Sequence, residues 1–344
     1  MVYVGMDVHQ SSTTFCFFDP VVGNGGQYRT YTRPTCRESF CEVLAPLGGQ
    51  CQVAFEVGTQ AQWIASMVRP LAGEVQVANP SRIPWLFRDG RKNDRLDARK
   101  LATLLYLKQL PTVHWPSANV SAWRALINHR RTLVQRRTMV KNRIRTILRA
   151  YGHRCPYKGL WTHRGQVGLE SLVFDEARTL MLTTLQDELT FFDQKIAAME
   201  AKLDAIAAAH PSVAMLRTIP GIGPRTGEAI VAFGDGVARF RDRRRFASYF
   251  GMTPTEDSSG LVERHGHISK RGPSVVRWVL VEAAHQAIKR CPAFRAFYDR
   301  VHRGKKDRAK KAIVAVGRKV LTIAYAMMRD QSPFCAEKVL GRAV

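Results

Sequence analysis

The chain has few acidic residues, no long apolar run and no paired-cysteine motif. Its 344 residues include 28 Asp and Glu against 53 Lys and Arg. No apolar stretch is long enough for a membrane-spanning helix, and the N-terminus lacks the charged and apolar segments of a signal peptide. The seven cysteines are scattered without a Cys-x-x-Cys pair, which argues against a disulfide framework and a zinc site. We therefore expect a soluble, cytoplasmic protein that does not enter a membrane.

The excess of basic residues is the strongest compositional signal. The formal net charge is +25 and the sequence pI is about 10.3. Such a surface attracts polyanions, because each phosphate that a Lys or Arg neutralises releases a condensed counterion. Nucleic acid is the expected partner, and an anionic membrane surface is the competing one.

Four of the scarce acids have an order and context that suit one active site. Asp7 lies within an apolar run, and Glu56 ends another. Asp94 and Asp97 are three residues apart in a stretch of helical composition, so both side chains project from one helix face. Two strand acids and two helix acids can hold two divalent ions about 3.5–4 Å apart for phosphodiester chemistry. Each acid alone is as well explained as a cap or surface charge, but the set predicts a site for two Mg²⁺ or Mn²⁺ ions.

Residues 1–115 have the pattern of a mixed α/β domain. Strands are expected at residues 2–7, 13–19, 27–32, 52–56 and 75–78, and helices at residues 36–47, 60–71 and 94–108. Three strands joined by tight turns, followed by alternating helices and strands, is the order of an RNase H-like sheet.

The chain changes character after this domain. Residues 121–168 contain twelve Lys and Arg and neither Asp nor Glu, and Leu126, Leu133, Val140 and Ile147 recur every seven residues. This pattern predicts a long basic helix over residues 122–151, whose charges need an anionic partner, either nucleic acid or an acidic helix. The candidate nucleic-acid contacts on this helix are Arg130, Arg131, Arg136, Arg137, Lys141 and Arg143.

An acidic helix follows in the sequence. Seven acids and three bases lie between Asp175 and Asp204. The apolar residues of this stretch alternate spacings of three and four, which is a coiled-coil seam: Leu182, Leu185, Leu189, Phe192, Ile196, Met199, Leu203 and Ile206. The seam can close against residues 122–151 or pair two protomers, and its regularity slightly favours a dimer.

A glycine-rich turn begins the last part of the chain. The segment Ile219-Pro220-Gly221-Ile222-Gly223 is typical of the turn of a helix-hairpin-helix, where backbone N–H groups and a helix N-terminus meet a phosphate. Gly221, Gly223 and Arg225 are its candidate contacts, and an ordinary corner between two helices is the alternative interpretation.

The remaining sequence is basic and mostly helical in pattern. Helices are expected at residues 273–289 and 311–329, and further candidate nucleic-acid contacts are Arg243, Arg244, Arg245, Lys270 and Arg271. His265 and His267 are expected in a loop, as phosphate or structural contacts rather than metal ligands. The predicted organisation is a catalytic domain at 1–115, a basic helix and coiled coil at 116–210, and a mostly α-helical domain at 211–344.

These motifs together resemble a known family, the DEDD transposases of bacterial insertion sequences. The resemblance covers nearly the whole chain and is carried by Val4-Gly5-Met6-Asp7-Val8, Phe55-Glu56-Val57-Gly58, Lys92-Asn93-Asp94-Arg95-Leu96-Asp97-Ala98-Arg99, Ile219-Pro220-Gly221-Ile222-Gly223, Phe246-Ala247-Ser248-Tyr249-Phe250-Gly251-Met252-Thr253-Pro254, Ser258-Ser259-Gly260 and Ile268-Ser269-Lys270-Arg271-Gly272. Asn93 stands where the family usually has Thr, and Val57 where it usually has Ala. Neither departure touches an acid of the quartet.

The resemblance implies a RuvC-like N-terminal domain and RNA-guided DNA recombination. A structured non-coding guide RNA would pair with target and donor DNA, in a bacterial cell and at the nucleoid. The protein would act as a homo-oligomer, a dimer or a tetramer on DNA. The resemblance also places a nucleophile at Ser259, which would form a covalent phosphoserine link beside the metal-binding acids. Ser258 is the rival for this role, and ordinary turn chemistry is the alternative for both serines.

Two other functional classes remain open on the sequence. A RuvC-like structure-specific endonuclease would hydrolyse DNA with the acid quartet and would need neither a serine nor an RNA. A non-catalytic scaffold would need only the basic surfaces and the glycine-rich turn. The acid quartet argues against the scaffold, and the Ser258-Ser259-Gly260 loop argues against the simple nuclease.

Overall fold

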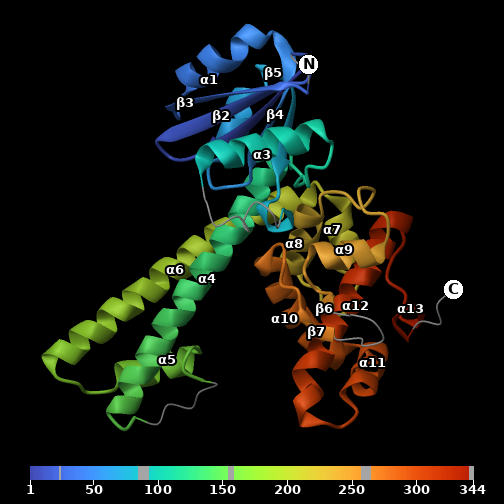
Figure 1. Cartoon of the computed structure of the whole chain (residues 1–344). Coiled ribbons are helices and arrows are strands. Elements are labelled where there is room, and N and C mark those ends of the chain that lie inside the picture. The colour runs from blue at the N-terminus through green and yellow to red at the C-terminus, as the bar shows by residue number, and fades with distance from the viewer. Residues whose placement is uncertain (23–24, 84–92, 154–158, 257–264, 341–344) are drawn as a thin grey trace. The chain divides into compact units, whose positions relative to one another are not determined.

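The computed structural model describes residues 1–22, 25–83, 93–153, 159–256 and 265–340 (Figure 1). These residues form two compact units, Met1–Trp115 and Pro116–Val344. Both units together contain, within the described ranges, no helix that is long and apolar enough to cross a bilayer. The sequence predicted three parts, whereas residues 116–210 and 211–344 lie in one unit here. The boundary between these two parts stays a prediction.

The first unit is built on one five-stranded sheet. Its strands are β1 (Val2–Val8), β2 (Ser12–Asp19), β3 (Gln27–Pro34), β4 (Gly49–Glu56) and β5 (Ala72–Ala78). They lie in the order β3-β2-β1-β4-β5, with β1, β2 and β3 antiparallel in sequence and β4 and β5 parallel to β1. The expected strands are all present. The last two begin three residues earlier than predicted, because Gly49 and Ala72 pair although neither favours strand by composition.

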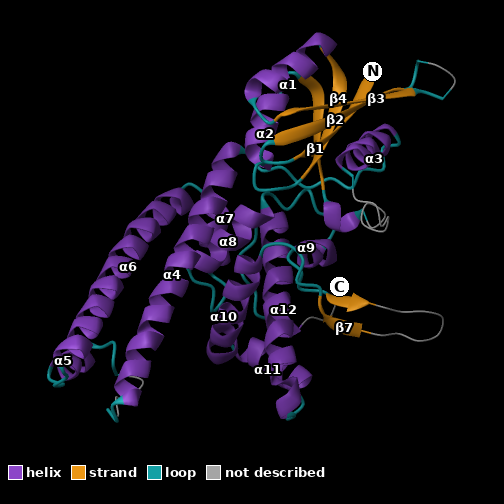
Figure 2. Ribbon diagram, turned by 60° about the vertical axis from the view of Figure 1, so that its left-hand side comes forward, coloured by secondary structure: helices purple, strands orange, loops and turns teal. Residues whose placement is uncertain are grey.

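Helices cover both faces of this sheet (Figure 2). One face packs against α1 (Arg37–Leu44), the short helix η1 (Ala45–Leu47) and α2 (Ala61–Val68), and the other against α3 (Asp94–Tyr106). Side chains alternate along a strand, so Val4 and Met6 join the core under α1 and α2, whereas Tyr3 packs with the core under α3. The mixed α/β architecture predicted for this region is confirmed.

Gly5 lets α3 approach the sheet closely. A Cβ atom at Gly5 would lie 2.0 Å from the carbonyl oxygen of Ala98 and 2.5 Å from the backbone nitrogen of Ala102. Any larger side chain would push α3 away from β1. Glycine at this position therefore fixes the distance between the strand and the helix that carry the predicted acids.

The second unit contains two long helices that pack on each other. α4 (Ala118–Ala150) and α6 (Glu176–Ala208) are joined through α5 (His163–Glu170). Leu182 and Leu189 of α6 are buried in one cluster with Val140 and Ile144 of α4. The seam thus closes within the chain, and the slight preference for a dimer at this seam is corrected. α4 also has an apolar residue at every seventh position, so it supplies the apolar surface on which the seam of α6 packs.

A larger helical core follows. It contains α7 (Pro211–Leu216), α8 (Pro224–Gly234), α9 (Arg243–Tyr249), α10 (Ser274–Arg290), α11 (Pro292–His302), α12 (Ala309–Asp330) and α13 (Glu337–Leu340). α9 and α11 were not predicted, because short helices rich in charge or aromatic residues give little periodicity. Buried residues of α4 and α6, such as Trp123 and Leu203, join the same core. The mostly helical character predicted for the C-terminal region is confirmed.

A small hairpin interrupts these helices. β6 (Pro254–Glu256) pairs antiparallel with β7 (His265–Ile268), so the histidines expected in a loop lie on a strand. Two glycines anchor the base of this hairpin: a Cβ at Gly251 would lie 2.2 Å from the Arg271 carbonyl oxygen, and one at Gly272 would lie 2.1 Å from the Tyr249 carbonyl oxygen. The Phe246–Pro254 and Ile268–Gly272 motifs are therefore packed on each other.

Candidate active site

Two parallel strands end side by side and present two of the predicted acids. Met6 of β1 is paired with Phe55 of β4, so Asp7 and Glu56 are the next residues at the carboxyl ends of neighbouring parallel strands. Both are half-buried. Ala54 belongs to the core under α3, and Glu56 and Asp7 project toward that same face because strand side chains alternate.

The other two acids reach this face from the first turn of α3. Asn93 caps the helix, and its side chain accepts a hydrogen bond from the Arg95 backbone nitrogen at 2.9 Å. Asn replaces the usual Thr here without loss of the cap, because both side chains carry a capping oxygen. Asp94 is exposed and Asp97 is half-buried at the N-terminal end of the helix, where the helix dipole favours negative charge.

A histidine that the sequence analysis missed lies between the strand and the helix. His9 Nε2 is 3.4 Å from Asp7 Oδ2 and 3.6 Å from Asp94 Oδ1. Within the described part of the chain, one ligand atom each of Asp7, His9 and Asp94 form a group in which all lie within 4.8 Å of one another. His9 follows Asp7 by two residues and lies one residue beyond the end of β1, so strand alternation alone does not place its side chain.

The surroundings of Asp7 shift its pKa in opposite directions. Burial raises the pKa of Asp7, the nearby His9 lowers it, and the carboxylates of Asp94 and Asp97 raise it again. Asp7 and Asp97 are therefore electrostatic neighbours, although Asp97 Oδ1 also lies 3.6 Å from Lys100 Nζ of the same helix. Like charges gathered in this way favour binding of a cation.

The donor set fits a divalent metal ion. Two carboxylate oxygens and one imidazole nitrogen lie within reach of one cation, and ions such as Mn²⁺ accept both kinds of ligand. Glu56 lines a neighbouring pocket of about 430 Å³ together with His9, Gln10 and Thr59. The structure brings Asp7, His9 and Asp94 together, with Asp97 in electrostatic range and Glu56 at the adjoining strand end.

The predicted serine nucleophile cannot be described in the same way. Ser258 and Ser259 lie in the connection from β6 to β7, within residues 257–264, outside the described residues. The assignment of Ser259 stays a prediction.

The candidate nucleic-acid contacts on α4 fall into two groups. Arg130 Nε donates to Glu200 Oε1 at 2.9 Å, and Arg137 Nη1 donates to Asp193 Oδ1 at 2.7 Å. These arginines are seven residues apart, as are their acids on α6, so they tie the two helices together. The acidic helix is thus a partner of the basic one, which is one of the two alternatives that the sequence left open.

Within the described residues, the other four candidate residues of α4 are not paired with acids of α6 in this way. Arg136 and Arg143 are exposed and also seven residues apart. Lys141 Nζ lies 4.8 Å from the centroid of the Trp161 ring, and burial lowers the pKa of its ammonium group. Arg131 Nη1 donates to Ser274 Oγ of α10 at 2.9 Å. Arg136 and Arg143 are therefore the α4 residues best placed for a polyanion.

The glycine-rich turn joins α7 to α8. Gly221 has a φ of +95°, and a Cβ there would lie 2.5 Å from the backbone nitrogen of Ala287 in α10, so packing requires this glycine. Gly223 faces open space at the N-terminus of α8. Arg225 is engaged elsewhere: it pairs with Asp204, and its Nη2 lies 2.8 Å from Oε1 of the fully buried Glu228.

The C-terminal candidate contacts are on the surface. Arg243, Arg244 and Arg245 begin α9 and are exposed, and Asp242 caps that helix by accepting from the backbone nitrogens of Arg244 and Arg245. Lys270 and Arg271 are exposed beside Gly272. Their positions are compatible with phosphate contacts, which remain predictions.

Comparisons with known proteins bear on both units. Residues 4–153 match a DEDD transposase family model described as "Transposase", and residues 213–299 match the "Transposase IS116/IS110/IS902 family". A putative transposase, y4rJ, of Sinorhizobium fredii is 30% identical over 301 residues, which cover 78% of this chain and 75% of that protein.

Two further relatives have informative names. The transposase for insertion sequence element IS1111A of Coxiella burnetii is 26% identical over 264 residues, covering 75% of this chain and 71% of that protein. The pilin gene-inverting protein of Moraxella bovis is 33% identical over 151 residues, 43% of this chain and 45% of that protein. The chain therefore belongs to the DEDD transposases of the IS110 family and is a transposase enzyme.

Proposed function

We propose that this transposase is an RNA-guided DNA recombinase that cuts and rejoins strands through a covalent phosphoserine intermediate. The acids Asp7, Glu56, Asp94 and Asp97 would hold two divalent ions, Mg²⁺ or Mn²⁺, and Ser259 would be the nucleophile. The observation that carries the proposal is the meeting of Asp7, His9 and Asp94 at the ends of β1 and α3 in a chain of net charge +25. A basic protein that gathers acids at one point supports a cation site for phosphate chemistry.

The sheet supports an RNase H-like assignment for the first unit. Its order, β3-β2-β1-β4-β5 with the first three strands antiparallel, agrees with the order expected for an RNase H-like sheet. Acids at the ends of the central strands and on a helix that crosses them are suited to such a site. The relative named a pilin gene-inverting protein supports recombination rather than simple cutting.

The chemistry of this proposal conserves phosphodiester bonds. Bound metal ions would polarise the scissile phosphate and lower the pKa of an attacking hydroxyl. The Ser259 Oγ would attack phosphorus as its proton passes to solvent, the bond from phosphorus to a sugar oxygen would break, and that oxygen would take up a proton. A sugar hydroxyl of a second strand would then attack the phosphoserine, form the new P–O bond and release Ser259. No external energy source is needed.

Basic surfaces would hold the nucleic acids. Arg136 and Arg143 on α4, Arg243–Arg245 on α9, and Lys270 with Arg271 would contact phosphates of target DNA, donor DNA and a structured guide RNA. Gly223 at the open start of α8 would allow a phosphate to approach backbone N–H groups, as in a helix-hairpin-helix. A homo-oligomer on DNA, in the cytoplasm at the nucleoid, completes the proposal.

The decisive experiment separates the serine mechanism from hydrolysis. The full-length protein is incubated with DNA and Mg²⁺ and denatured, and the mixture is examined for DNA that remains attached until protease is added. We expect the adduct in wild type and in Ser258→Ala, and its loss in Ser259→Ala with nucleic-acid binding retained. An adduct at another residue contradicts the assignment of Ser259. Cleavage without any adduct supports the alternative, a metal-dependent RuvC-like endonuclease.

The RNA part of the proposal needs its own test. The protein is purified from cells that carry the element with its flanking sequence, and bound nucleic acid is sequenced. We expect one discrete structured RNA that contains segments complementary to target and donor DNA. Copurification of heterogeneous RNA alone contradicts guidance, although it would leave the transposase chemistry untouched.

A further inference from the structure

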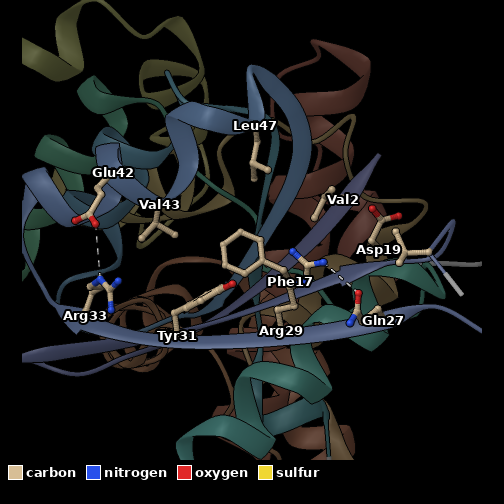
Figure 3. A pocket seen from close by; sticks show the side chains of 11 residues that line it. Val2, Phe17, Asp19, Gln27, Arg29, Tyr31, Arg33, Glu42, Val43 and Leu47 are labelled. Carbon is tan, nitrogen blue, oxygen red and sulfur yellow. Dashed lines mark hydrogen bonds and ion pairs between the residues drawn. The ribbon is translucent and has the colours of Figure 1, made fainter.

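A second hollow in the first unit borders the edge strand β3 (Figure 3). It has a volume of about 400 Å³ and is bounded by β3, by Phe17 of β2 and by the α1–η1 segment. Val2, at the opposite end of β1 from Asp7, also lines it. The hollow is on the α1 face of the sheet, because Phe17 packs with the core beneath α1 and α2. It is therefore separate from the acid cluster, which faces α3.

The strand that borders this hollow has an unusual surface. β3 is an edge strand, and every residue of it except Tyr28 is exposed. Arg29, Tyr31 and Arg33 alternate on the hollow side, since Tyr31 is paired with Phe15 and Arg29 with Phe17. Tyr31 remains 45% exposed. It meets the Phe17 ring edge to face, with centroids 5.7 Å apart.

The need to prevent another strand from pairing with this sheet edge explains only part of the surface of β3. Charged side chains on an edge strand discourage pairing with another strand. That argument accounts for Arg29 and Arg33, but not for an aromatic ring placed between them at the mouth of a hollow. In Figure 3 the Tyr31 and Phe17 rings lie between Arg33 on one side and Arg29 on the other. Val43 and Leu47 add apolar side chains to the lining.

We propose that this hollow binds an unpaired nucleotide of a single-stranded nucleic acid. A base would stack on the Tyr31 ring, which Phe17 supports edge to face, as bases stack on aromatic side chains in single-strand binding proteins. Arg29 and Arg33 would neutralise the phosphates on either side of that base. Glu42, whose Oε1 lies a loose 3.9 Å from Arg33 Nε, would accept a hydrogen bond from an exocyclic amino group.

The charge pattern favours a nucleotide over a protein partner. The hollow offers two guanidinium groups beside an exposed aromatic ring, a combination that suits a phosphate next to a base. Asp19 and Glu42 lie at opposite ends of the lining, so the central part around Tyr31 faces the arginines (Figure 3). The inference rests on the proposed nucleic-acid substrate, but it needs neither the metal ions nor Ser259.

Photocrosslinking of the full-length protein tests the site directly. Single-stranded RNA with 4-thiouridine and single-stranded DNA with 4-thiothymidine are irradiated with the protein at subsaturating concentration, and crosslinked peptides are identified by mass spectrometry. We expect crosslinks on the β3 peptide that contains Tyr31. The yields with RNA and DNA identify which strand is the ligand, and either result supports the site.

Matched variants show whether the contact is specific. Tyr31→Ala should lower the β3 crosslink yield about 5- to 150-fold, the equivalent of one lost base-stacking contact, and Tyr31→Phe should retain it. Arg29→Ala with Arg33→Ala should also lower it. The control, Arg82→Ala with Lys108→Asn, removes the same charge from exposed positions elsewhere in this unit and should leave the yield unchanged.

The test also separates this inference from the proposed chemistry. Asp7→Asn should lose cleavage but retain the β3 crosslink. Absence of crosslinks on β3 with both probes overturns the inference, and so do unchanged yields in folded Tyr31→Ala and Arg29→Ala/Arg33→Ala proteins. A change of oligomeric mass on Tyr31→Ala, without a change in crosslinking, would instead assign the hollow to contacts between protein chains.

Discussion

The two units use their few acids in opposite ways. In the first unit, Asp7 and Asp94 face one another across His9, and Asp97 is close enough to raise the pKa of Asp7. In the second unit, Glu200 and Asp193 each meet an arginine of α4. The same residue types therefore repel one another in one region and are neutralised in the other.

This difference separates chemistry from structure. Acids that face each other oppose folding, so their clustering is better explained by a ligand than by stability. Acids that face arginines shield a helix that would otherwise repel itself, so they are explained by the fold alone. The following variants test whether the two regions respond as this contrast requires.

The largest effect is expected in the acid cluster. Asp7→Asn removes a ligand charge and should lower DNA cleavage by more than about 1,000-fold, because the proposed metal ions supply most of the charge stabilisation. In EDTA its melting temperature should equal or exceed that of wild type, since one of three repelling carboxylates is neutral. Cleavage assays and thermal melts check both results, with exposed Glu74→Gln as control. Robust cleavage by Asp7→Asn, or by wild type in EDTA, contradicts the metal site.

The α4–α6 seam should respond in stability instead. Leu189 is buried between the two helices, so Leu189→Asp should lower the free energy of unfolding by about 3–5 kcal/mol. Leu180→Asp on the same helix is the matched control, because Leu180 is 66% exposed and its replacement should change stability by less than about 0.5 kcal/mol. Urea unfolding and light scattering measure the outcome. A halved mass with normal stability would show that the seam joins two protomers.

Glu228 is an exception in the second unit and gives a pH test. It is fully buried near Arg225, neither of its carboxylate oxygens accepts a hydrogen bond from the described residues, and burial raises its pKa from 4.5 to about 7. Its contribution to stability is therefore complete below about pH 4.5, declines as pH rises, and is lost above about pH 7.

The corresponding substitution should remove this pH dependence. Glu228→Gln keeps the shape of the side chain without its charge, and should be more stable than wild type at about pH 8 by up to about 3 kcal/mol. At about pH 4 the two proteins should differ little. Urea unfolding at both pH values is the measurement, with Glu188→Gln at an exposed position of α6 as control. A destabilised Glu228→Gln at high pH would show that the pair with Arg225 outweighs burial.

The smallest effect concerns α4 and distinguishes its two groups of arginines. Arg136→Gln with Arg143→Gln removes exposed charge and should reduce the salt dependence of binding to a labelled RNA hairpin by about 1.4–1.8 in log–log slope. Arg130→Gln with Arg137→Gln should leave the slope nearly unchanged and lower stability by about 1 kcal/mol per pair. Fluorescence titration at several salt concentrations separates the two. Equal slopes in both double variants would show that the paired and the exposed arginines of α4 contribute equally to RNA binding.

Much of the fold could be predicted from local patterns. Alternating apolar residues gave the strands, and the seven-residue repeats of Leu126–Ile147 and Leu182–Ile206 gave α4 and α6, because both patterns report burial of one face. The short helices α9 and α11 escaped prediction. Their turns are held by tertiary packing, such as the burial of Phe246 and Phe294, rather than by periodicity.

The sequence likewise predicted some residues of the candidate site and missed others. Asp7, Asp94 and Asp97 were identified from spacing, since strand and helix geometry fix where side chains point. His9 was missed, because it lies one residue beyond β1 and a single exposed histidine has no periodic signal. Arg130, Arg137 and Arg225 were expected on phosphates, yet α6 and Glu228 engage them, which only the packing of distant helices could decide.

The sequence alone determined the basic character, the mixed α/β start, the long helices and the four candidate acids, because each depends on composition or on spacing within one element. The tertiary structure decided that the coiled-coil seam closes within the chain, that His9 lies between Asp7 and Asp94, and that Tyr31 stands between two arginines at a sheet edge. These features depend on which elements meet and in what register. That choice is made by the summed packing of a whole unit, to which no single segment of sequence gives access.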